Sequence, residues 1–317
     1  MESGLKLTFD TYYKYENIKD YIKSFPYSVA EYKTNIDPEK INEIILEIDD
    51  FLLLVSLALE KICLCTGWVA YSNSKIVRYL RRDRTIPDRD TKRSYSDYLI
   101  EPFELKTFLE KSYNAFINFN DRNLLRNILF PIVRKKKISV ETHYLILFAI
   151  LESTVLNYKK NNKYEPILPP DDFNVLKDDL EKFIKKKLNS DENMKERRKF
   201  IYEKLPELNR ISFKSSFELF QNHYKIYVGD LWPLIESKEG ATLAHIRNKI
   251  IHGEIFSNHQ FNAVRLAMEH LQIIVERIVF TLLNWDISNT KVSLEYVKQY
   301  HSKEFEKVKY YQKLFNE

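Results

Sequence analysis

Glycine is scarce in this chain of 317 residues: only five glycines are present, at positions 4, 67, 229, 240 and 253. No two of them are close enough to form a dinucleotide-binding fingerprint or a P-loop. Both motifs need closely spaced glycines, because the backbone must approach a phosphate group. The sequence therefore excludes nucleotide enzymes of the Rossmann and Walker classes.

Cysteine is scarcer still, with only Cys63 and Cys65 in the chain. No second pair of cysteines or histidines stands at the spacing that zinc ligands require. The sequence therefore predicts neither a structural zinc site nor a disulfide framework, and this fits a reducing cytoplasm. We expect the protein to use no metal and no cofactor.

Long apolar runs are also missing. The longest, Phe51 to Leu59, is about half of the roughly 20 residues that a membrane-spanning helix needs. The first residues, Met1 to Asp10, lack the basic segment and apolar stretch of a signal peptide. We therefore expect a cytoplasmic protein that does not associate with membranes.

The charge is mildly basic, with a net charge of +5 and a pI near 8.8. Such an excess permits nucleic-acid binding without requiring it, because local patches matter more than totals. Basic runs of this size are more often solvated helix faces than phosphate contacts. The main runs cover residues 134–137, 185–187 and 197–199.

The chain is rich in leucine, isoleucine, glutamate and lysine, and its apolar residues follow helical periodicity, so we predict a mainly α fold. A segment rich in threonine and aromatic residues, 5–15, is predicted to be a strand that pairs with 63–71 and 75–79 in a small sheet. Loops are predicted at 85–96 and 157–170. Helices are predicted at 38–62 (capped by Asp37), 104–119, 122–133, 140–156, 171–188, 191–204 and 258–283.

Three regions follow from these elements: a mostly helical N-terminal region with the small sheet (1–135), a helical domain (136–290) and a helical C-terminal tail (291–317). The predicted helix at 258–283 begins with a capping box, Ser257 with Gln260. Its apolar residues form one seam, which is typical of a core face and, less often, of a dimer interface. The seam consists of Phe261, Val264, Met268, Leu271, Val275, Ile278 and Leu282.

The segment before this helix, 243–254, carries the most distinctive polar pattern. At about 100° per residue, Asn248 and His252 lie together on one helix face, nearly opposite an apolar stripe. Gly253 is the glycine expected just beyond a helix end, so His252 lies in the last turn, where the helix dipole favours the imidazolium. Arg247 lies about 140° from His252, and its long side chain could reach a ligand held between this helix and a facing element.

Metal-free RNA cleavage needs few protein groups: a proton acceptor for the 2′-hydroxyl, a proton donor for the 5′-oxygen, and a cation for the charge at phosphorus. One histidine, one arginine and one amide per subunit, doubled across a two-fold axis, would supply them. The bare spacing is not specific, because Arg265 and His270 also match it. We interpret that second pair as a solvated helix face, since Glu269 stands four residues after Arg265.

The string Arg247-Asn248-x3-His252-Gly253 resembles the motif of the HEPN domain, in particular its ApeA-like branch. The surrounding helices support the resemblance, which covers about 136–285. They are the helix around 218–224, the helix 144–156 with its Leu-Glu step at Glu152, and the long helix that ends in Ile274-Val275-Glu276-Arg277-Ile278.

The resemblance implies a HEPN-type helical bundle that forms a homodimer with a composite site, and a metal-independent endoribonuclease used as a toxin or in antiviral defence (abortive infection). By it, Arg247 would bind the scissile phosphate of RNA, Asn248 would be the polar residue that follows the arginine, and His252 would be the general acid or base. Glu152 would support the site. Glu254 stands where some HEPN toxins carry a modified tyrosine, so that form of control is not expected.

Other interpretations remain open. His245, seven residues before His252, shares its face and is either an RNA-facing group or simply exposed; as a metal ligand pair the spacing would be unusual. The leading alternative to the nuclease is a non-catalytic helical module for RNA binding or protein interaction. The role of residues 1–135, and any regulatory protein or antitoxin, are not indicated by the sequence.

Overall fold

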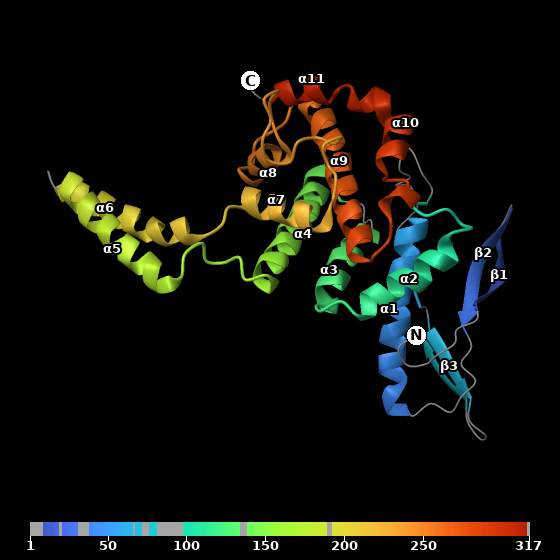
Figure 1. Cartoon of the computed structure of the whole chain (residues 1–317). Coiled ribbons are helices and arrows are strands. Elements are labelled where there is room, and N and C mark those ends of the chain that lie inside the picture. Colours follow the sequence, from blue (N-terminus) through green and yellow to red (C-terminus); the bar gives the residue numbers. More distant parts are fainter. Residues whose placement is uncertain are drawn as a thin grey trace. The chain divides into compact units, whose positions relative to one another are not determined.

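The computed structural model describes residues 9–18, 21–30, 38–65, 67–71, 76–80, 98–133, 138–188 and 192–315. The chain is mainly helical with small antiparallel sheets, as predicted (Figure 1). It divides into two compact units, Met1–Lys92 with Asp97–Arg134, and Arg93–Ser96 with Lys135–Glu317. The predicted helix cap Asp37 and the predicted loop at 85–96 lie outside the described residues.

The first unit is built on three helices: α1 (Ile41–Leu59), preceded by the 3-10 turn η1 (Pro38–Lys40), α2 (Leu105–Ile117) and α3 (Arg122–Val133). Helix α1 packs on both α2 and α3. It ends earlier than predicted, because Glu60 adopts the left-handed conformation with φ of 49°. The buried core between the helices includes Leu54, Leu57, Phe108, Phe116, Leu125 and Ile128.

A partly exposed ion pair also joins α3 to α1. Nε and Nη2 of Arg126 donate to the two carboxylate oxygens of Asp50 at 2.7 and 2.6 Å. This bidentate geometry raises the pKa of Arg126 through its hydrogen bonds to Asp50. The pair therefore fixes how the two helices are registered against each other.

The sheet pairing differs from the prediction. Strands β1 (Phe9–Ile18) and β2 (Tyr21–Ala30) form one antiparallel pair, and β3 (Gly67–Tyr71) and β4 (Ile76–Leu80) form another. The predicted pairing of β1 with the β3 and β4 segments was therefore wrong, although β3 and β4 do pair with each other. Pairing strands that are adjacent in the chain closes only short loops, which costs less entropy than bringing β1 to β3.

The second unit holds the remaining helices, with α9 (Asn258–Leu282) running through its middle (Figure 1). Every residue from His270 to Phe280 is buried, so this half of α9 is enclosed on all sides and is not limited to one apolar seam. The predicted seam is core from Val264 onward, with Met268 half-buried, whereas Phe261 at its start is 40% exposed. The other elements are α4 (Val140–Asn161), α5 (Pro170–Lys187), α6 (Glu192–Lys204), η2 (Leu205–Asn209), α7 (Phe213–Tyr224), α8 (Leu243–Ile251), η3 (Ile287–Asn289), α10 (Leu294–Phe305) and α11 (Val308–Lys313).

The start of α9 is fixed by specific contacts. The predicted capping box is confirmed, because the side chains of Ser257 and Gln260 each accept a hydrogen bond from the other's backbone N–H. Gln260 Nε2 also donates to the carbonyl oxygen of Leu314, and Gln312 Nε2 donates to that of Ala241. The C-terminal residues thus pack against the start of α9 and the segment before α8.

Two further features complete this unit. Helix α4 runs to Asn161, five residues into the predicted loop at 157–170. Asn209 closes the base of the α5–α6 hairpin, because its side chain bonds both the N–H and the carbonyl oxygen of Leu168. Among the described residues, the structure contains no helix with the length and apolar character needed to cross a membrane.

Candidate functional site

Helix α8, which carries the Arg-x4-His motif, has well-defined ends. Thr242 caps its start, and its Oγ1 accepts a hydrogen bond from the N–H of His245 at 3.2 Å. His252 is the residue that follows the last helical turn, and Gly253 adopts the left-handed conformation with φ of +74°. The prediction of Gly253 as the glycine beyond the helix end is confirmed, while His252, predicted in the last turn, lies one residue after it.

Contacts with α4 hold α8 in place. The hydroxyl of Tyr144 donates to the carbonyl oxygen of Leu243 at 2.8 Å, and both residues are completely buried. Burial raises the pKa of Tyr144 well above its ordinary value, because the phenolate could not be solvated there. Ile246, one turn further along α8, is also completely buried. The apolar face of α8 is therefore anchored, and its motif residues are placed on a rigid element.

Arg247 is held by three neighbours. Its Nη1 donates to Oδ1 of Asn248 at 3.2 Å, and its Nη2 lies 3.4 Å from each carboxylate oxygen of Glu152 on α4. The guanidinium carbon also lies 5.7 Å from the ring centroid of Phe148, a buried residue one turn before Glu152. An arginine side chain carries five N–H donors, so several remain for an anionic ligand.

His252 and His245 present their side chains to solvent. Neither imidazole forms a hydrogen bond or ion pair with another residue that the structure describes. The backbone N–H of His252 donates to the carbonyl oxygen of Asn248 at 2.9 Å, which is its link to the rest of the motif. The imidazole of His252 is thus accessible to a ligand.

Glu254 has a structural partner. Its carboxylate pairs with Nζ of Lys249 at 2.6 Å, and its backbone N–H donates to the carbonyl oxygen of the same lysine. These contacts close the C-terminal end of α8. The structure therefore joins Glu254 to Lys249 and not to Arg247 or Asn248.

The structure thus brings together three of the six predicted site residues, Arg247, Asn248 and Glu152. Sequence reasoning missed Phe148 and Tyr144, which support them from α4. A signal was available: Tyr144, Phe148 and Glu152 follow one another at intervals of four residues, so they share one helix face.

The second Arg-x4-His match requires a correction. Arg265 is exposed and lies 3.5 Å from Glu269, as its spacing predicted. His270, however, is completely buried, and its Nδ1 accepts a hydrogen bond from the backbone N–H of Trp232 at 2.9 Å. The interpretation of His270 as part of a solvated face was wrong, because α9 is covered on the side that its heptad pattern left open.

Within the described ranges, no group of three or more histidine, cysteine, aspartate or glutamate side chains is arranged to hold a metal ion. Comparisons of the chain with models of protein families, with curated proteins and with solved structures found no match.

Proposed function

We propose that this protein is a metal-independent endoribonuclease of the HEPN type, acting in the cytoplasm as an RNA-cleaving toxin or antiviral defence (abortive infection) effector. One observation carries the proposal. Arg247 is fixed beside Asn248 by contacts from α4, while His252 of the same helix is exposed without a side-chain partner among the described residues. A preorganised cation and a solvent-facing imidazole on the same helix are the groups that this chemistry needs.

In the proposed reaction, the 2′-oxygen of a ribose attacks the adjacent phosphorus and the bond to the 5′-oxygen breaks. Arg247 stabilises the negative charge that develops on the phosphate oxygens, and Asn248 helps to orient the guanidinium. His252 takes the proton from the 2′-hydroxyl or gives one to the departing 5′-oxygen. Glu152 acts as a positioning residue, because it touches Arg247 and not the reacting atoms.

The reaction needs both a proton acceptor and a proton donor, and one Arg-x4-His motif supplies one imidazole. We therefore propose a homodimer in which the histidines of two copies face the same phosphate. The surface around His252 supports this, because Ile251 and Ile255 leave 50% and 97% of their areas exposed. Apolar side chains beside a polar site are favourable material for an interface between subunits.

A nuclease assay in EDTA tests the proposal. Purified His252→Ala and Arg247→Ala should each cleave bulk cellular RNA at least about a hundredfold more slowly than the wild type. Arg265→Ala is the matched control, because it removes an exposed arginine of the second Arg-x4-His match. His270→Ala is unsuitable as a control, since His270 is buried. Equal cleavage by the wild type and His252→Ala would refute the proposal.

A second candidate is a non-catalytic module that binds RNA or a protein. The pairing of Arg247 with Glu152 favours it, since a carboxylate beside the guanidinium offsets part of the charge that a phosphate would meet. Strongly salt-dependent RNA binding without cleavage in any of these assays would identify this function.

A further inference from the structure

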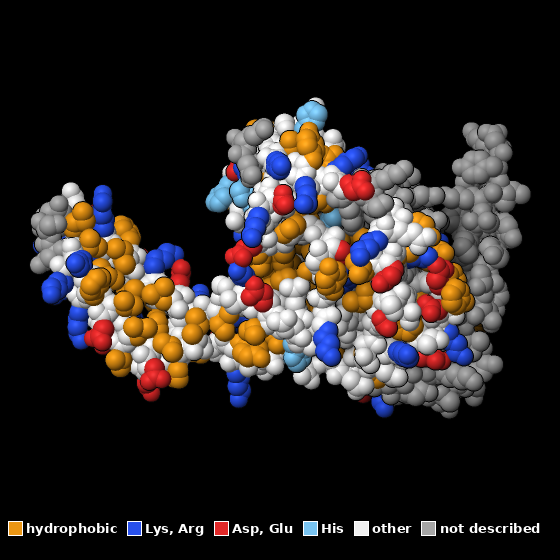
Figure 2. Space-filling view, turned by 45° about the horizontal axis from the view of Figure 1, so that its top comes forward, with side chains coloured by type: hydrophobic (Ala, Val, Ile, Leu, Met, Phe, Trp, Pro, Cys, Tyr) orange, Lys and Arg blue, Asp and Glu red, His pale blue; other side chains and the backbone are white. Residues whose placement is uncertain are grey.

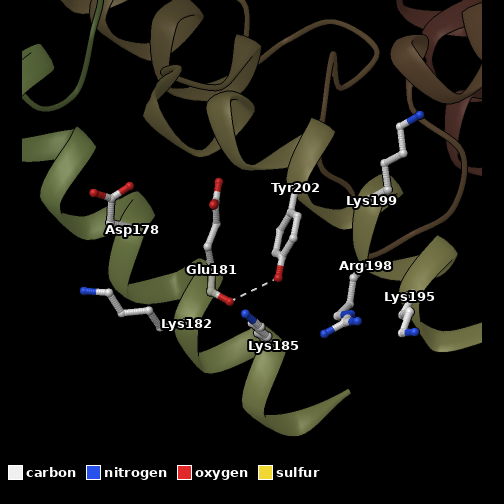
Figure 3. A pocket seen from close by; sticks show the side chains of 8 residues that line it. All are labelled: Asp178, Glu181, Lys182, Lys185, Lys195, Arg198, Lys199 and Tyr202. Carbon is white, nitrogen blue, oxygen red and sulfur yellow. Dashed lines mark hydrogen bonds between the residues drawn. The ribbon is translucent and has the colours of Figure 1, made fainter. Parts of the chain in front are cut away.

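A second charged surface lies outside the α8 site, on the α5–α6 hairpin. Figure 2 shows hydrophobic side chains over this hairpin, with Lys and Arg side chains around them. Between the two helices is an open groove of about 500 Å³ (Figure 3). Its lining side chains are Asp178, Glu181, Lys182 and Lys185 from α5 and Lys195, Arg198, Lys199 and Tyr202 from α6.

The charge of the groove is uneven. Helix α5 begins with Asp171 and Asp172 and ends with three consecutive lysines, 185–187. Five lining side chains are cationic and two are carboxylates, an excess of three positive charges. One of the lysines, Lys182, pairs with Asp179 at 3.1 Å. Even with that cation neutralised, the groove retains a net positive charge that suits an anion with several closely spaced charges.

The groove is held open by contacts between its walls. The hydroxyl of Tyr202 on α6 donates to the backbone carbonyl oxygen of Glu181 on α5 at 3.2 Å (Figure 3). At the base of the hairpin, the side chain of Asn209 forms hydrogen bonds with the backbone of Leu168. Cationic side chains from both helices are thus presented at a spacing that the backbone sets.

The same helices expose two aromatic rings. Phe183 on α5 and Phe200 on α6 each leave 58% of their areas exposed. Nζ of Lys187 lies 5.9 Å from the ring centroid of Phe183. Neither ring lines the groove, and at about 100° per residue both lie on helix faces turned away from its lining residues. The groove itself therefore offers charge and no stacking platform.

We propose that the α5–α6 groove binds the phosphate backbone of RNA, with Lys185 and Arg198 contacting phosphates. This surface would hold the substrate of the α8 site. The choice of RNA as the ligand rests on the proposed function, whereas the choice of a polyanion rests on the charges of the groove.

The first test measures binding of the wild-type protein to a fluorescent 2′-O-methyl oligouridylate, which lacks the attacking hydroxyl and so stays intact. The double variant Lys185→Gln/Arg198→Gln loses two phosphate contacts. The plot of log affinity against log salt concentration should therefore become less steep by about 1.4, since each phosphate contact to a single strand contributes about 0.7. The matched control is Lys186→Gln/Arg197→Gln. It removes equal charge from neighbouring exposed positions that do not line the groove, so its slope should stay near the wild-type value.

The second test uses the rings to identify the face that binds. Phe183→Ala and Phe200→Ala should each leave the affinity and the salt slope near the wild-type values, because neither ring lines the groove. A loss of roughly fivefold or more with an unchanged slope would indicate base stacking on the other face and would overturn the proposal. Circular dichroism verifies that each variant keeps its helices. Equal losses in the groove and control pairs would mean non-specific attraction and would overturn the proposal. Binding to vesicles containing anionic lipid, with none to the oligouridylate, would overturn it in favour of a membrane surface.

The two proposals fail in distinguishable ways. If the wild type binds the oligouridylate through the groove but never cleaves unmodified RNA, the proposed nuclease function is wrong and the proposed RNA binding by the groove is supported. If the wild type cleaves RNA and the groove variants bind and cleave as it does, the groove is wrong and the nuclease stands.

Discussion

Nη2 of Arg247 lies 3.4 Å from both carboxylate oxygens of Glu152, a residue 95 positions earlier in the chain. A single nitrogen makes both contacts, so the pair is not bidentate, and both side chains are partly exposed. Exposed pairs of this kind contribute about 0–1 kcal/mol to stability. The main effect of Glu152 is therefore on where the guanidinium points.

Replacing Glu152 separates positioning from charge. Glu152→Ala should lower the rate constant for RNA cleavage by roughly tenfold to a hundredfold, because a misplaced guanidinium no longer meets the phosphate. Glu152→Gln keeps an oxygen that can accept from Arg247, so it should retain most of the rate. Single-turnover cleavage by the two variants decides this, and an alanine variant as fast as the wild type would exclude a positioning role.

Tyr144 offers a test of how α8 is anchored. Tyr144→Phe removes the hydrogen bond to the carbonyl oxygen of Leu243 and nothing else, so the free energy of unfolding should fall by about 1 kcal/mol. Tyr310→Phe is a control, because that tyrosine is 58% exposed. Urea denaturation gives both values, and equal stability of Tyr144→Phe and the wild type would show that this hydrogen bond does not secure the helix.

The same tyrosine predicts a dependence on alkaline pH. Its pKa is raised in the folded protein by burial, so the unfolded chain loses this proton first. The stabilising contribution of Tyr144 is complete below pH of about 10 and is lost as the pH rises toward the higher pKa of the folded state. The stability difference between the wild type and Tyr144→Phe should therefore shrink above pH of about 10. Unfolding at several alkaline pH values measures it, and a constant difference would contradict the prediction.

Features with local causes could be predicted from the sequence. The span of α3 agrees with its prediction, 122–133, and α9 ends one residue before its predicted end. The start of α9 was specified by Ser257 and Gln260, and the end of α8 by Gly253. Caps and periodicity act within a few residues, so one sequence is enough to reveal them.

Features that depend on distant partners could not be predicted. Phe148 lies under Arg247 because α4 packs on α8, and nothing near Arg247 in the sequence indicates it. His270 is buried because the segment around Trp232 covers that side of α9. The pairing of β1 with β2 depends on which strands meet in the folded chain. The alternation of apolar and polar residues within a strand does not specify its partner.

The exposed isoleucines beside His252 predict how a dimer is disrupted. Ile255→Asp should convert a dimer into monomers and abolish RNA cleavage, because an unpaired charge at an apolar interface is strongly unfavourable. Leu208→Asp, at another exposed apolar position, should change neither property. Analytical ultracentrifugation and the nuclease assay report the outcome. A fully active Ile255→Asp monomer would rule out the composite site.

A buried ion pair in the second unit connects α9 to its surroundings. Nη1 and Nη2 of Arg277 donate to the two carboxylate oxygens of Asp230 at 2.6 and 2.7 Å. Nη1 also donates to the carbonyl oxygen of Tyr227, and Nε donates to that of Val292. The guanidinium thus links the chain segments before α8 and after α9, where almost no solvent reaches it.

Asp230→Asn should be strongly destabilising, because it leaves the charge of Arg277 buried without a counter-ion. Breaking such a pair costs about 3–5 kcal/mol of the free energy of unfolding, whereas an exposed pair is worth about 1 kcal/mol at most. Glu239→Gln, which breaks the exposed pair with Lys309, is the matched control. Denaturant unfolding of both variants compares the two losses. Since Arg277 does not line the α8 site, the cleavage rate of folded Asp230→Asn should stay near that of the wild type, and a stable but inactive variant would assign this pair to catalysis.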